Sequence, residues 1–168
     1  MPIQRLNHAV LYVRDVDRSV AFYTEALGFR VKVAFPGAAF LQAEGSSNDH
    51  DLGLFAVGDR AGASGAGRTT VGLYHLAWEV DTLAELQRVA DVLRRHGALV
   101  GASDHGSTKA LYAQDPDGLE FEVSWLVPAD LLTDDVTVQT LPLDLDAAIA
   151  RYGADTAGGI GVSTPALR

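Results

Sequence analysis

The chain has 168 residues, of which 48% are hydrophobic and 21% charged, as is typical of a globular domain large enough to bury its own core. Its formal net charge of -9 argues against nucleic acid as a partner, because binding to phosphates needs a basic surface. The absence of cysteine excludes disulfides, thiolate nucleophiles and cysteine zinc sites. Any metal must therefore be held by histidine and carboxylate side chains.

The sequence opens on MPIQRLNHAVLYV, which lacks the basic and apolar regions of a signal peptide. No stretch approaches the run of about 18 apolar residues that a membrane-spanning helix needs. We therefore expect a cytoplasmic protein without a membrane partner.

The first part of the chain has the pattern of a strand, a helix and three further strands. An alternating strand leads to a helix start in DVDR at 15–18, and Gly28 ends the helix. The predicted inward face of this helix consists of Val16, Val20, Tyr23 and Leu27. Turn signals then separate three predicted strands, at about 30–35, 38–43 and 51–57. This order is a βαβββ module.

The same pattern recurs after a glycine-rich stretch at 58–68, which has no strand-to-helix context and so favours a linker over a phosphate loop. A strand is followed by a capping box formed by Thr82 and Glu85, a helix, and a stop at Gly97. Three more strands are predicted at about 98–102, 109–114 and 119–126.

The fold class is therefore predicted to be α+β, built from two βαβββ modules. The predicted division is a single domain over 1–126, with modules at about 3–57 and 72–126, a linker at 58–71, and an extension at 127–168. In this extension LDAAIARYG is a candidate short helix, whereas DTAGGIGVSTPALR is expected to be poorly ordered. We predict an extension that is partly disordered.

Two histidines occupy matching places in the two modules. His8 and His75 each precede a strand valine, Val13 or Val80, by five residues, and they are 67 residues apart (75 − 8). Because strand side chains alternate between the two faces, the two imidazoles should point to equivalent sides of a pseudo-twofold pair and could meet.

The pairing in the last hairpin determines which carboxylate points to the same side as the two imidazoles. In its turn, at 115–118, a type I conformation with Gly118 as a left-handed bulge pairs Tyr112 with Glu122. A bare two-residue loop would pair Tyr112 with Phe121 instead.

A carboxylate directed inward from a strand built for burial is costly unless it is paired or bound to metal. Glu122 is such a residue, because Phe121 and Val123 flank it on the opposite face. Glu120 has the same parity and is the rival ligand, although its place beside the turn favours solvation. Two imidazoles and one carboxylate form the ligand set typical of non-haem Fe(II).

These motifs resemble the vicinal oxygen chelate superfamily, and within it the type I extradiol, or catechol 2,3-, dioxygenases. The resemblance covers about residues 3–126. It implies a cupped mixed sheet around a metal site, with His8, His75 and Glu122 as the ligands. Fe(II) is the implied metal, with Mn(II) as an alternative, and a homodimer is the implied assembly.

Three further residues match the dioxygenase pattern more specifically: His50 in NDHDLGLF, His105 in DHGSTKALY, and Tyr112 ten residues before Glu122. The resemblance implies that the protein opens a catechol ring with O2 and places both oxygen atoms in the product. His50 would then handle a proton, oriented by Asp49 or Asp51, while His105 and Tyr112 would contact the catechol oxygens.

The chain departs from the dioxygenase pattern in two respects. Leu119 stands where the family usually has Asn, and the chain has two modules where the larger enzymes have four. Both departures bear on which substrate the protein takes more than on which reaction it catalyses.

Other interpretations remain open. His8 and His75 could be satisfied core residues, His50 a turn residue, and His105 and Tyr112 parts of a loop and the core. His96, at the end of a predicted helix, is assigned to structure.

Alternative functions on the same scaffold are a glyoxalase-like isomerase, a thiol transferase, and a metal-free resistance protein that binds a small molecule. The isomerase usually needs a fourth, carboxylate ligand on the last strand of the first module, where LGLFAVG has only apolar residues and glycine.

Overall fold

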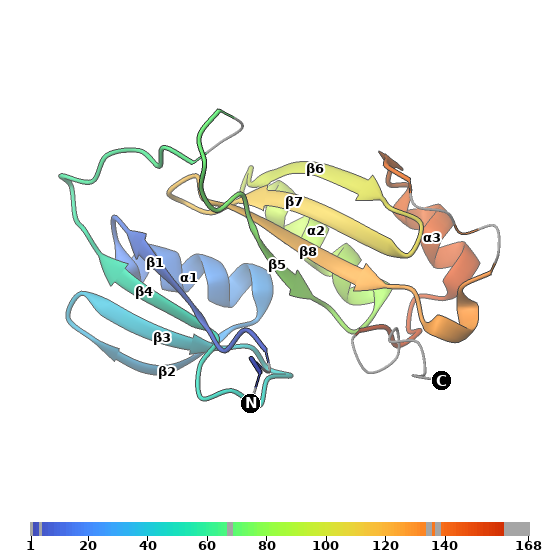
Figure 1. Ribbon diagram of the computed structural model, residues 1–168, viewed down its shortest axis with the longest axis horizontal. Helices are drawn as coiled ribbons and strands as arrows, with labels where there is room; N and C mark the ends of the chain where they lie inside the picture. Colours follow the sequence, from blue (N-terminus) through green and yellow to red (C-terminus); the bar gives the residue numbers. More distant parts are fainter. Residues whose placement is uncertain (1, 4, 67–68, 134–135, 137–138, 160–168) are drawn as a thin grey trace. The chain divides into compact units, whose positions relative to one another are not determined.

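The computed structural model describes residues 2–3, 5–66, 69–133, 136 and 139–159 (Figure 1). The chain divides into two compact units: Met1–Gly65 with Asp115–Gly118, and Ala66–Gln114 with Leu119–Arg168. Within the described residues, no helix combines the length and the hydropathy that crossing a membrane would require.

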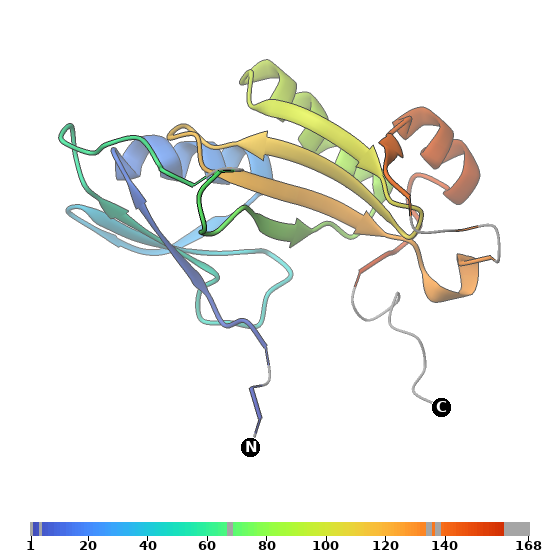
Figure 2. The ribbon, with the colours of Figure 1, turned by 45° about the horizontal axis from the view of Figure 1, so that its top comes forward.

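The described residues of the first unit form one helix and a four-stranded sheet. Its elements are β1 (Ala9–Val13), α1 (Val16–Leu27), β2 (Arg30–Phe35), β3 (Ala38–Gln42) and β4 (Leu52–Ala56). The strand order is β1-β4-β3-β2, with β1 parallel to β4 and the other neighbours antiparallel. Helix α1 lies across one face of this sheet (Figure 2).

Helix α1 begins and ends where its capping residues predict. The side chain of Asp15 accepts a hydrogen bond from the Arg18 N–H, and Gly28 ends the helix with a left-handed φ of 70°. The buried side of the helix includes Val16 and Tyr23, as expected, whereas the predicted Val20 and Leu27 lie at its half-exposed margins. The packing centre of the helix is therefore rotated slightly from the predicted face.

The second unit repeats this order and adds a C-terminal segment. Its elements are β5 (Leu76–Glu79), α2 (Leu83–Arg95), β6 (Leu99–Asp104), β7 (Thr108–Gln114), β8 (Glu120–Leu126), the short 3-10 helix η1 (Ala129–Leu131), β9 (Leu141–Pro142) and α3 (Leu145–Tyr152). The strand order is β5-β8-β7-β6-β9, with β5 parallel to β8. The α+β class and the two βαβββ modules are thus confirmed.

At the start of α2 the Thr82 half of the predicted capping box is present, whereas the Glu85 carboxylate pairs with Arg88, and the helix ends just before the predicted stop at Gly97. Thr82 Oγ1 accepts a hydrogen bond from the Glu85 N–H, and His96 is the C-terminal cap, next to two arginines in the last turn. His96 is therefore a helix-capping residue, in agreement with the structural role predicted from the sequence.

The two sheets have matching registers, which identifies the residue in the first unit that corresponds to Glu122. Val10 of β1 pairs with Gly53 of β4, and Ala77 of β5 pairs with Glu122 of β8. Val10 and Ala77 are related by the same offset that relates His8 to His75. The counterpart of the Glu122 carboxylate is therefore a glycine, which has no side chain to offer a metal.

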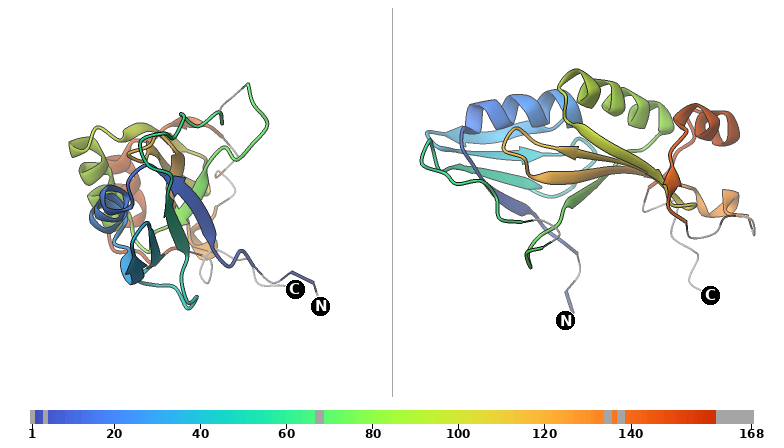
Figure 3. Two further views of the ribbon diagram at one scale, coloured as in Figure 1. Left: turned by 90° about the vertical axis from the view of Figure 1, so that its left-hand side faces the viewer. Right: turned by 90° about the horizontal axis from the view of Figure 1, so that it is seen from above.

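The C-terminal segment packs onto the second unit. β9 pairs with β6, and α3 lies on the same side of the sheet as α2 (Figure 3). The indole N–H of Trp125 donates to the Thr156 carbonyl at 3.1 Å, and the ring of Tyr152 lies 5.5 Å from that of Trp125. The helix predicted in LDAAIARYG is present. Poor order was predicted for 155–168; residues 160–168 of this stretch lie outside the described residues, whereas Thr156 and Gly158 hydrogen-bond to the rest of the second unit.

Candidate functional site

His75 and Glu122 lie together in the second unit. His75 immediately precedes β5, and its Nε2 is 3.4 Å from Oε2 of Glu122 on the neighbouring strand β8. The two side chains are 25% and 14% exposed. The other ring nitrogen of His75, Nδ1, is buried and has no hydrogen-bond partner. The imidazole is thus incompletely satisfied by protein groups.

This pair fits a bound cation. Two ligand atoms that each lie about 2.1 Å from one metal ion, at tetrahedral to right angles, are separated by about 3.0–3.4 Å. The separation of 3.4 Å between His75 Nε2 and Glu122 Oε2 falls in that range. Among the residues that the structure describes, however, no cluster of three His, Asp or Glu side chains is arranged to hold a metal.

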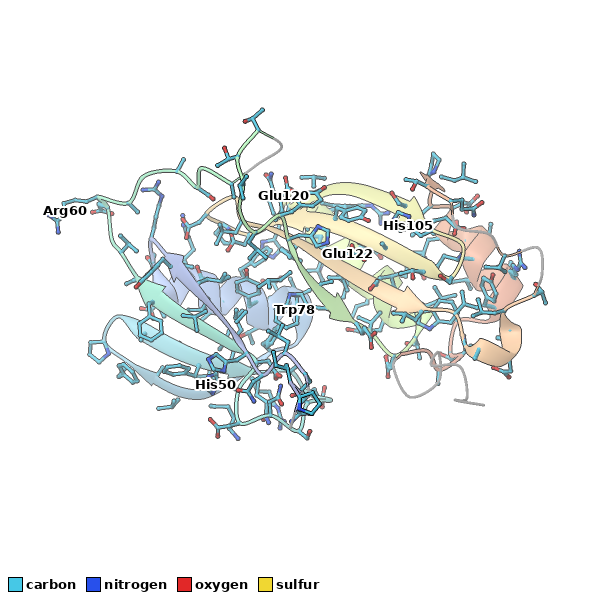
Figure 4. The ribbon with its side chains drawn as sticks, viewed as in Figure 1. His50, Arg60, Trp78, His105, Glu120 and Glu122 are labelled. Atoms are coloured by element: carbon cyan, nitrogen blue, oxygen red, sulfur yellow. The ribbon has the colours of Figure 1, made fainter. Side chains whose placement is uncertain are left out.

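Tyr112 and His105 extend the same cluster. Tyr112 on β7 pairs directly with Glu122 on β8, and its hydroxyl lies 2.9 Å from Nε2 of His105. Figure 4 labels His105 and Glu122 on this unit. Burial raises the pKa of Tyr112, and the charge of Glu122 and a hydrogen bond with it add to the increase. The hydroxyl therefore stays protonated near neutral pH and acts as a hydrogen-bonding group rather than as a phenolate.

The register that places Tyr112 opposite Glu122 follows from the turn, as predicted. Gly118 has a φ of 81°, and its N–H donates to the Asp115 carbonyl at 2.9 Å. Glu120, the rival carboxylate, is exposed and pairs with Gln114 at the start of the strand. The half-buried Glu122 is the better placed of the two because it lies beside His75.

His8 and His50 lie next to one another in the first unit. His8 immediately precedes β1, and His50 lies in the loop that enters β4, so the parallel β1/β4 pairing places their ring centroids 4.5 Å apart. Nδ1 of His8 is 2.7 Å from the side-chain oxygen of Asn7. Since an amide oxygen only accepts hydrogen bonds, this contact places the His8 proton on Nδ1 and leaves Nε2 free to bind a metal.

His50 is held by an aspartate and an aromatic ring. Its Nδ1 lies 3.0 Å from the carboxylate of Asp49, and the ring of Phe40 packs edge-on at 4.8 Å. The hydrogen bond with His50 lowers the pKa of Asp49. The His50 side chain is 20% exposed and Asp49 is 89% exposed. Asp49 therefore orients a partly accessible imidazole from the solvent side.

Asp51 has a different role, which is to hold the loop that carries His50. Its buried carboxylate accepts three hydrogen bonds, from the Ala43 N–H at 2.8 Å, the Ser46 hydroxyl at 2.7 Å and the Asn48 side-chain amide at 2.7 Å. Of the two aspartates that flank His50, Asp49 contacts the ring and Asp51 organises the backbone.

Two neighbours of the site were not anticipated from the sequence. The ring of Tyr74 lies 4.5 Å from that of His75, and its place beside a candidate ligand is the one signal that could have pointed to it. The main-chain carbonyl of Gln139 lies 3.0 Å from Nδ1 of His105. A backbone carbonyl leaves no trace in the residue type, so the sequence has no signal for this contact.

The sequence model of the glyoxalase/bleomycin resistance protein/dioxygenase superfamily matches residues 5–123. Catechol-2,3-dioxygenase of Bacillus subtilis is 31% identical over 118 residues, which cover 70% of this chain and 40% of that protein. Biphenyl-2,3-diol 1,2-dioxygenase 3 of Rhodococcus globerulus is 34% identical over 68% of this chain and 59% of its own length. The chain thus spans only about half the length of these relatives.

Other similar proteins have a different named activity or share only the fold. Lactoylglutathione lyase of Salmonella typhimurium is 30% identical over 71% of this chain and 90% of its own length. A glyoxylase/bleomycin resistance protein/dioxygenase domain from Frankia sp. EAN1pec has a TM-score of 0.59 at 24% identity, over 73% of this chain and 92% of that one. Fosfomycin resistance protein FosX from Mesorhizobium loti has a TM-score of 0.57 at 20% identity, over 79% of this chain and 100% of that one.

The match to the family model covers well over half of the chain and coincides with the two βαβββ modules. The chain belongs to the glyoxalase/bleomycin resistance protein/dioxygenase superfamily, also known as the vicinal oxygen chelate superfamily.

Proposed function

We propose that the protein is an extradiol dioxygenase that opens the ring of a catechol-type substrate and places both atoms of O2 in the product. The observation that carries this proposal is the hydrogen-bonded pair of His105 and Tyr112 beside Glu122. The identity of about 30% to two ring-cleaving dioxygenases supports it.

The proposed metal ligands are His75, Glu122 and, from the sequence repeat, His8. The His75 and Glu122 pair fits a cation by its 3.4 Å separation, and His8 has an Nε2 that is free to coordinate. The donor set of two imidazoles and one carboxylate suits Fe(II), with Mn(II) as the alternative. Such an ion, when bound, would supply the redox coupling between the aromatic ring and O2.

Tyr112 and His105 are proposed to bind and orient the catechol oxygens. A neutral phenol hydroxyl both donates and accepts hydrogen bonds, so Tyr112 can accept the hydroxyl hydrogen of a catechol while it donates to His105. The pair therefore offers the substrate proton a destination at His105 Nε2, which favours an ionised catechol in the site.

His50 is proposed to hold and return a proton during turnover. An imidazole can both donate and accept a proton, and the Asp49 carboxylate at its Nδ1 fixes the ring orientation. The apolar contact with Phe40 limits the access of water to one side of the ring. These surroundings suit a general acid or base better than a turn residue, which would hydrogen-bond to nearby backbone.

A glyoxalase-like isomerase is the second candidate, since a lactoylglutathione lyase is 30% identical and matches over 90% of its own length. The structure provides an argument against it. The fourth carboxylate that the isomerase usually needs would have to stand at the counterpart of Glu122, and that position is Gly53. A methyl group added there would already contact Phe40 and Val10 at 3.4 Å, so the position is closely packed.

A thiol transferase or a metal-free resistance protein also has this fold, and FosX from Mesorhizobium loti is a fold neighbour. The sequence of that FosX is 20% identical to this chain, so the similarity concerns the fold alone. A metal-free binder would not require an imidazole nitrogen and a carboxylate oxygen at 3.4 Å, the spacing of two ligands of one cation.

The decisive experiment measures oxygen uptake by the full chain loaded with Fe(II) under air, across a panel of catechols with different ring substituents. We expect one O2 consumed per catechol and a yellow ring-opened product. The same preparation, loaded in turn with Mn(II), Ni(II) and Zn(II), is tested with the adduct of glutathione and methylglyoxal. Isomerisation of that adduct, without oxygen uptake on any catechol, would replace the dioxygenase with the glyoxalase alternative.

The homodimer implied by the resemblance is also a proposal. Light scattering decides it by comparing the mass in solution with the single-chain mass of 17.8 kDa. The monomer mass would refute the dimer.

A further inference from the structure

We infer that the C-terminal segment beyond the βαβββ modules supplies a positioning group for this site. The main-chain carbonyl of Gln139 holds His105 in the tautomer that carries its proton on Nδ1, which leaves Nε2 as the acceptor for the Tyr112 hydroxyl. The tautomer itself is independent of the reaction, whereas its effect on turnover rests on the proposed function.

The assignment follows from what each partner can donate. Nδ1 of His105 lies 3.0 Å from the carbonyl oxygen of Gln139, and a carbonyl can only accept, so Nδ1 must carry the hydrogen. A neutral imidazole has a single N–H, so Nε2 carries none and accepts. Tyr112, whose oxygen is 2.9 Å from Nε2, can then only donate to it, and the Glu122 carboxylate competes as the other acceptor for the single hydroxyl hydrogen. The hydroxyl of Thr140, 3.4 Å from Nδ1, is a weaker second contact.

Gln139 is anchored so that its carbonyl stays in place. Its side chain hydrogen-bonds to the carboxylate of Asp104, the residue just before His105. Directly after it, β9 pairs with β6, with Leu141 opposite Asp104. The side chain of Gln139 and the short strand that begins two residues later are therefore both tied to the end of β6, next to His105.

Asp104 is itself well fixed, which extends this anchoring into the core. Its carboxylate accepts from the Lys109 ammonium at 2.6 Å and from the Gly106 N–H at 2.7 Å. Burial acts to raise the pKa of Asp104, but the Lys109 and Gly106 hydrogen bonds, with that of Gln139, more than offset it and lower the pKa. Lys109 is 3% exposed, so this ion pair lies in a protected environment. The acceptor of the His105 proton is thus connected through Asp104 to the buried ammonium of Lys109.

The tautomer matters because it sets the direction in which a proton can move. When a catechol hydroxyl gives its proton to the Tyr112 oxygen, the Tyr112 proton passes to the bare Nε2 of His105. The substrate loses one proton, tyrosine stays neutral, and His105 becomes an imidazolium whose Nδ1–H still donates to Gln139. The opposite tautomer, with hydrogen on Nε2, blocks this transfer.

The primary test is long-range ¹H–¹⁵N NMR of the full-length chain labelled with ¹⁵N-histidine, at a pH above 8, where imidazoles are neutral. Spectra are recorded without added metal and with Zn(II), which is diamagnetic, and His105→Gln assigns the resonances. We expect protonated Nδ1 and unprotonated Nε2 for His105 in both samples. An Nε2–H tautomer, or rapid exchange between the two forms, would overturn the inference.

A pair of neighbouring variants tests the role of Gln139. Gln139→Gly removes the side-chain anchor on Asp104 and loosens the carbonyl, and both tautomers of His105 should then be populated. Thr140→Val removes only the more distant hydroxyl and should leave the Nδ1–H form intact. If Gln139→Gly keeps the wild-type tautomer and Thr140→Val loses it, the carbonyl is not the positioning group.

Turnover separates this inference from the proposed function. On a catechol that the wild-type chain cleaves, Gln139→Gly should lower kcat by about 10-fold with a smaller change in KM, as is common when a supporting hydrogen bond is lost. If no catechol is cleaved by any form, the dioxygenase proposal fails, while the NMR result still decides the tautomer. If the catechol is cleaved and Gln139→Gly changes the tautomer without changing kcat, the link from tautomer to turnover is wrong.

Discussion

Nε2 of His105 lies 2.9 Å from the hydroxyl of Tyr112, and Tyr112 stands directly across the β7/β8 ladder from Glu122. This relationship joins a loop, a strand pair and a carboxylate into one set of polar contacts within the second unit. Each side chain has a partner that fixes its orientation, which is what a group that binds reacting oxygens requires.

Replacing Tyr112 with Phe should weaken catalysis without loss of metal. The ring still packs, but a hydrogen bond worth about 1.5–3 kcal/mol to an ionised substrate is lost, so kcat/KM should fall by roughly 10- to 150-fold. Tyr12→Phe, at a tyrosine that is 76% exposed, is the matched control and should keep the wild-type rate. Oxygen uptake at equal metal content measures both, and equal rates for the two variants would remove Tyr112 from the site.

Metal binding should depend on Glu122 and not on Glu120. Glu122→Gln keeps the size of the side chain but removes the charge, so it should lose most of the bound metal, and His75→Ala and His8→Ala should lose it too. Glu120→Gln, on an exposed residue two positions earlier, should bind normally. Elemental analysis of protein purified without chelator gives the occupancy, and full occupancy in the Glu122 variant would contradict the ligand assignment.

His50→Phe should separate chemistry from folding. Phenylalanine preserves the ring contact with Phe40, so the variant should fold, bind metal and bind catechol. Loss of a positioned acid or base should lower turnover by about 100-fold or more. A turn residue would behave differently, with a lower Tm and an unchanged rate per folded molecule. Thermal melts and oxygen uptake on the same samples distinguish the two.

The two aspartates that flank His50 should differ sharply in their effect on stability. Asp51→Ala removes the acceptor of three hydrogen bonds and leaves their donors without a partner, which should cost about 2–3 kcal/mol in the free energy of unfolding. Asp49→Ala, at an 89% exposed side chain, should change it by no more than about 0.5 kcal/mol. Urea titrations measure both, and similar losses would show that Asp51 does not organise the loop.

Stability at alkaline pH should depend on Tyr23. Burial raises the pKa of Tyr23 well above its ordinary value, and the charge of Asp115, which accepts its hydroxyl at 3.1 Å, adds to this. A raised pKa means that the folded state holds the proton more tightly. The stabilisation is therefore complete below about pH 10 and is lost as the pH rises toward the folded-state pKa.

Over that window the free energy of unfolding should fall by up to about 1.4 kcal/mol per pH unit through this group alone. Tyr23→Phe cannot ionise and should have a flatter profile between pH 9 and about 11, even if it starts less stable because the hydrogen bond to Asp115 is gone. Urea unfolding across this range gives both profiles, and parallel slopes would show that Tyr23 does not titrate in this window.

Most of the local structure follows from the sequence. The predicted strands agree with β2, β3, β4, β6, β7 and β8 to within about two residues, because alternating apolar residues and turn signals are local features. The turn chemistry of Gly118 was enough to place Tyr112 opposite Glu122, since in a hairpin the loop type sets the register. The repeat that relates His8 to His75 is likewise visible in the sequence alone.

Tertiary structure decided which of these residues touch. The 4.5 Å approach of His8 and His50 depends on the parallel pairing of β1 with β4, two strands far apart in the chain. The same pairing makes Gly53 the counterpart of Glu122, because a parallel register has no short turn from which it could be predicted.

The contact between His105 and Gln139 shows most clearly what the amino-acid sequence leaves open. Its acceptor is a main-chain carbonyl, a group that every residue carries, so only the course of the folded chain selects this one. The sequence by itself determined the two modules and the residues available for chemistry, since periodicity and residue type are local properties. The fold determined their partners, because long-range pairing brings together groups that no local pattern connects.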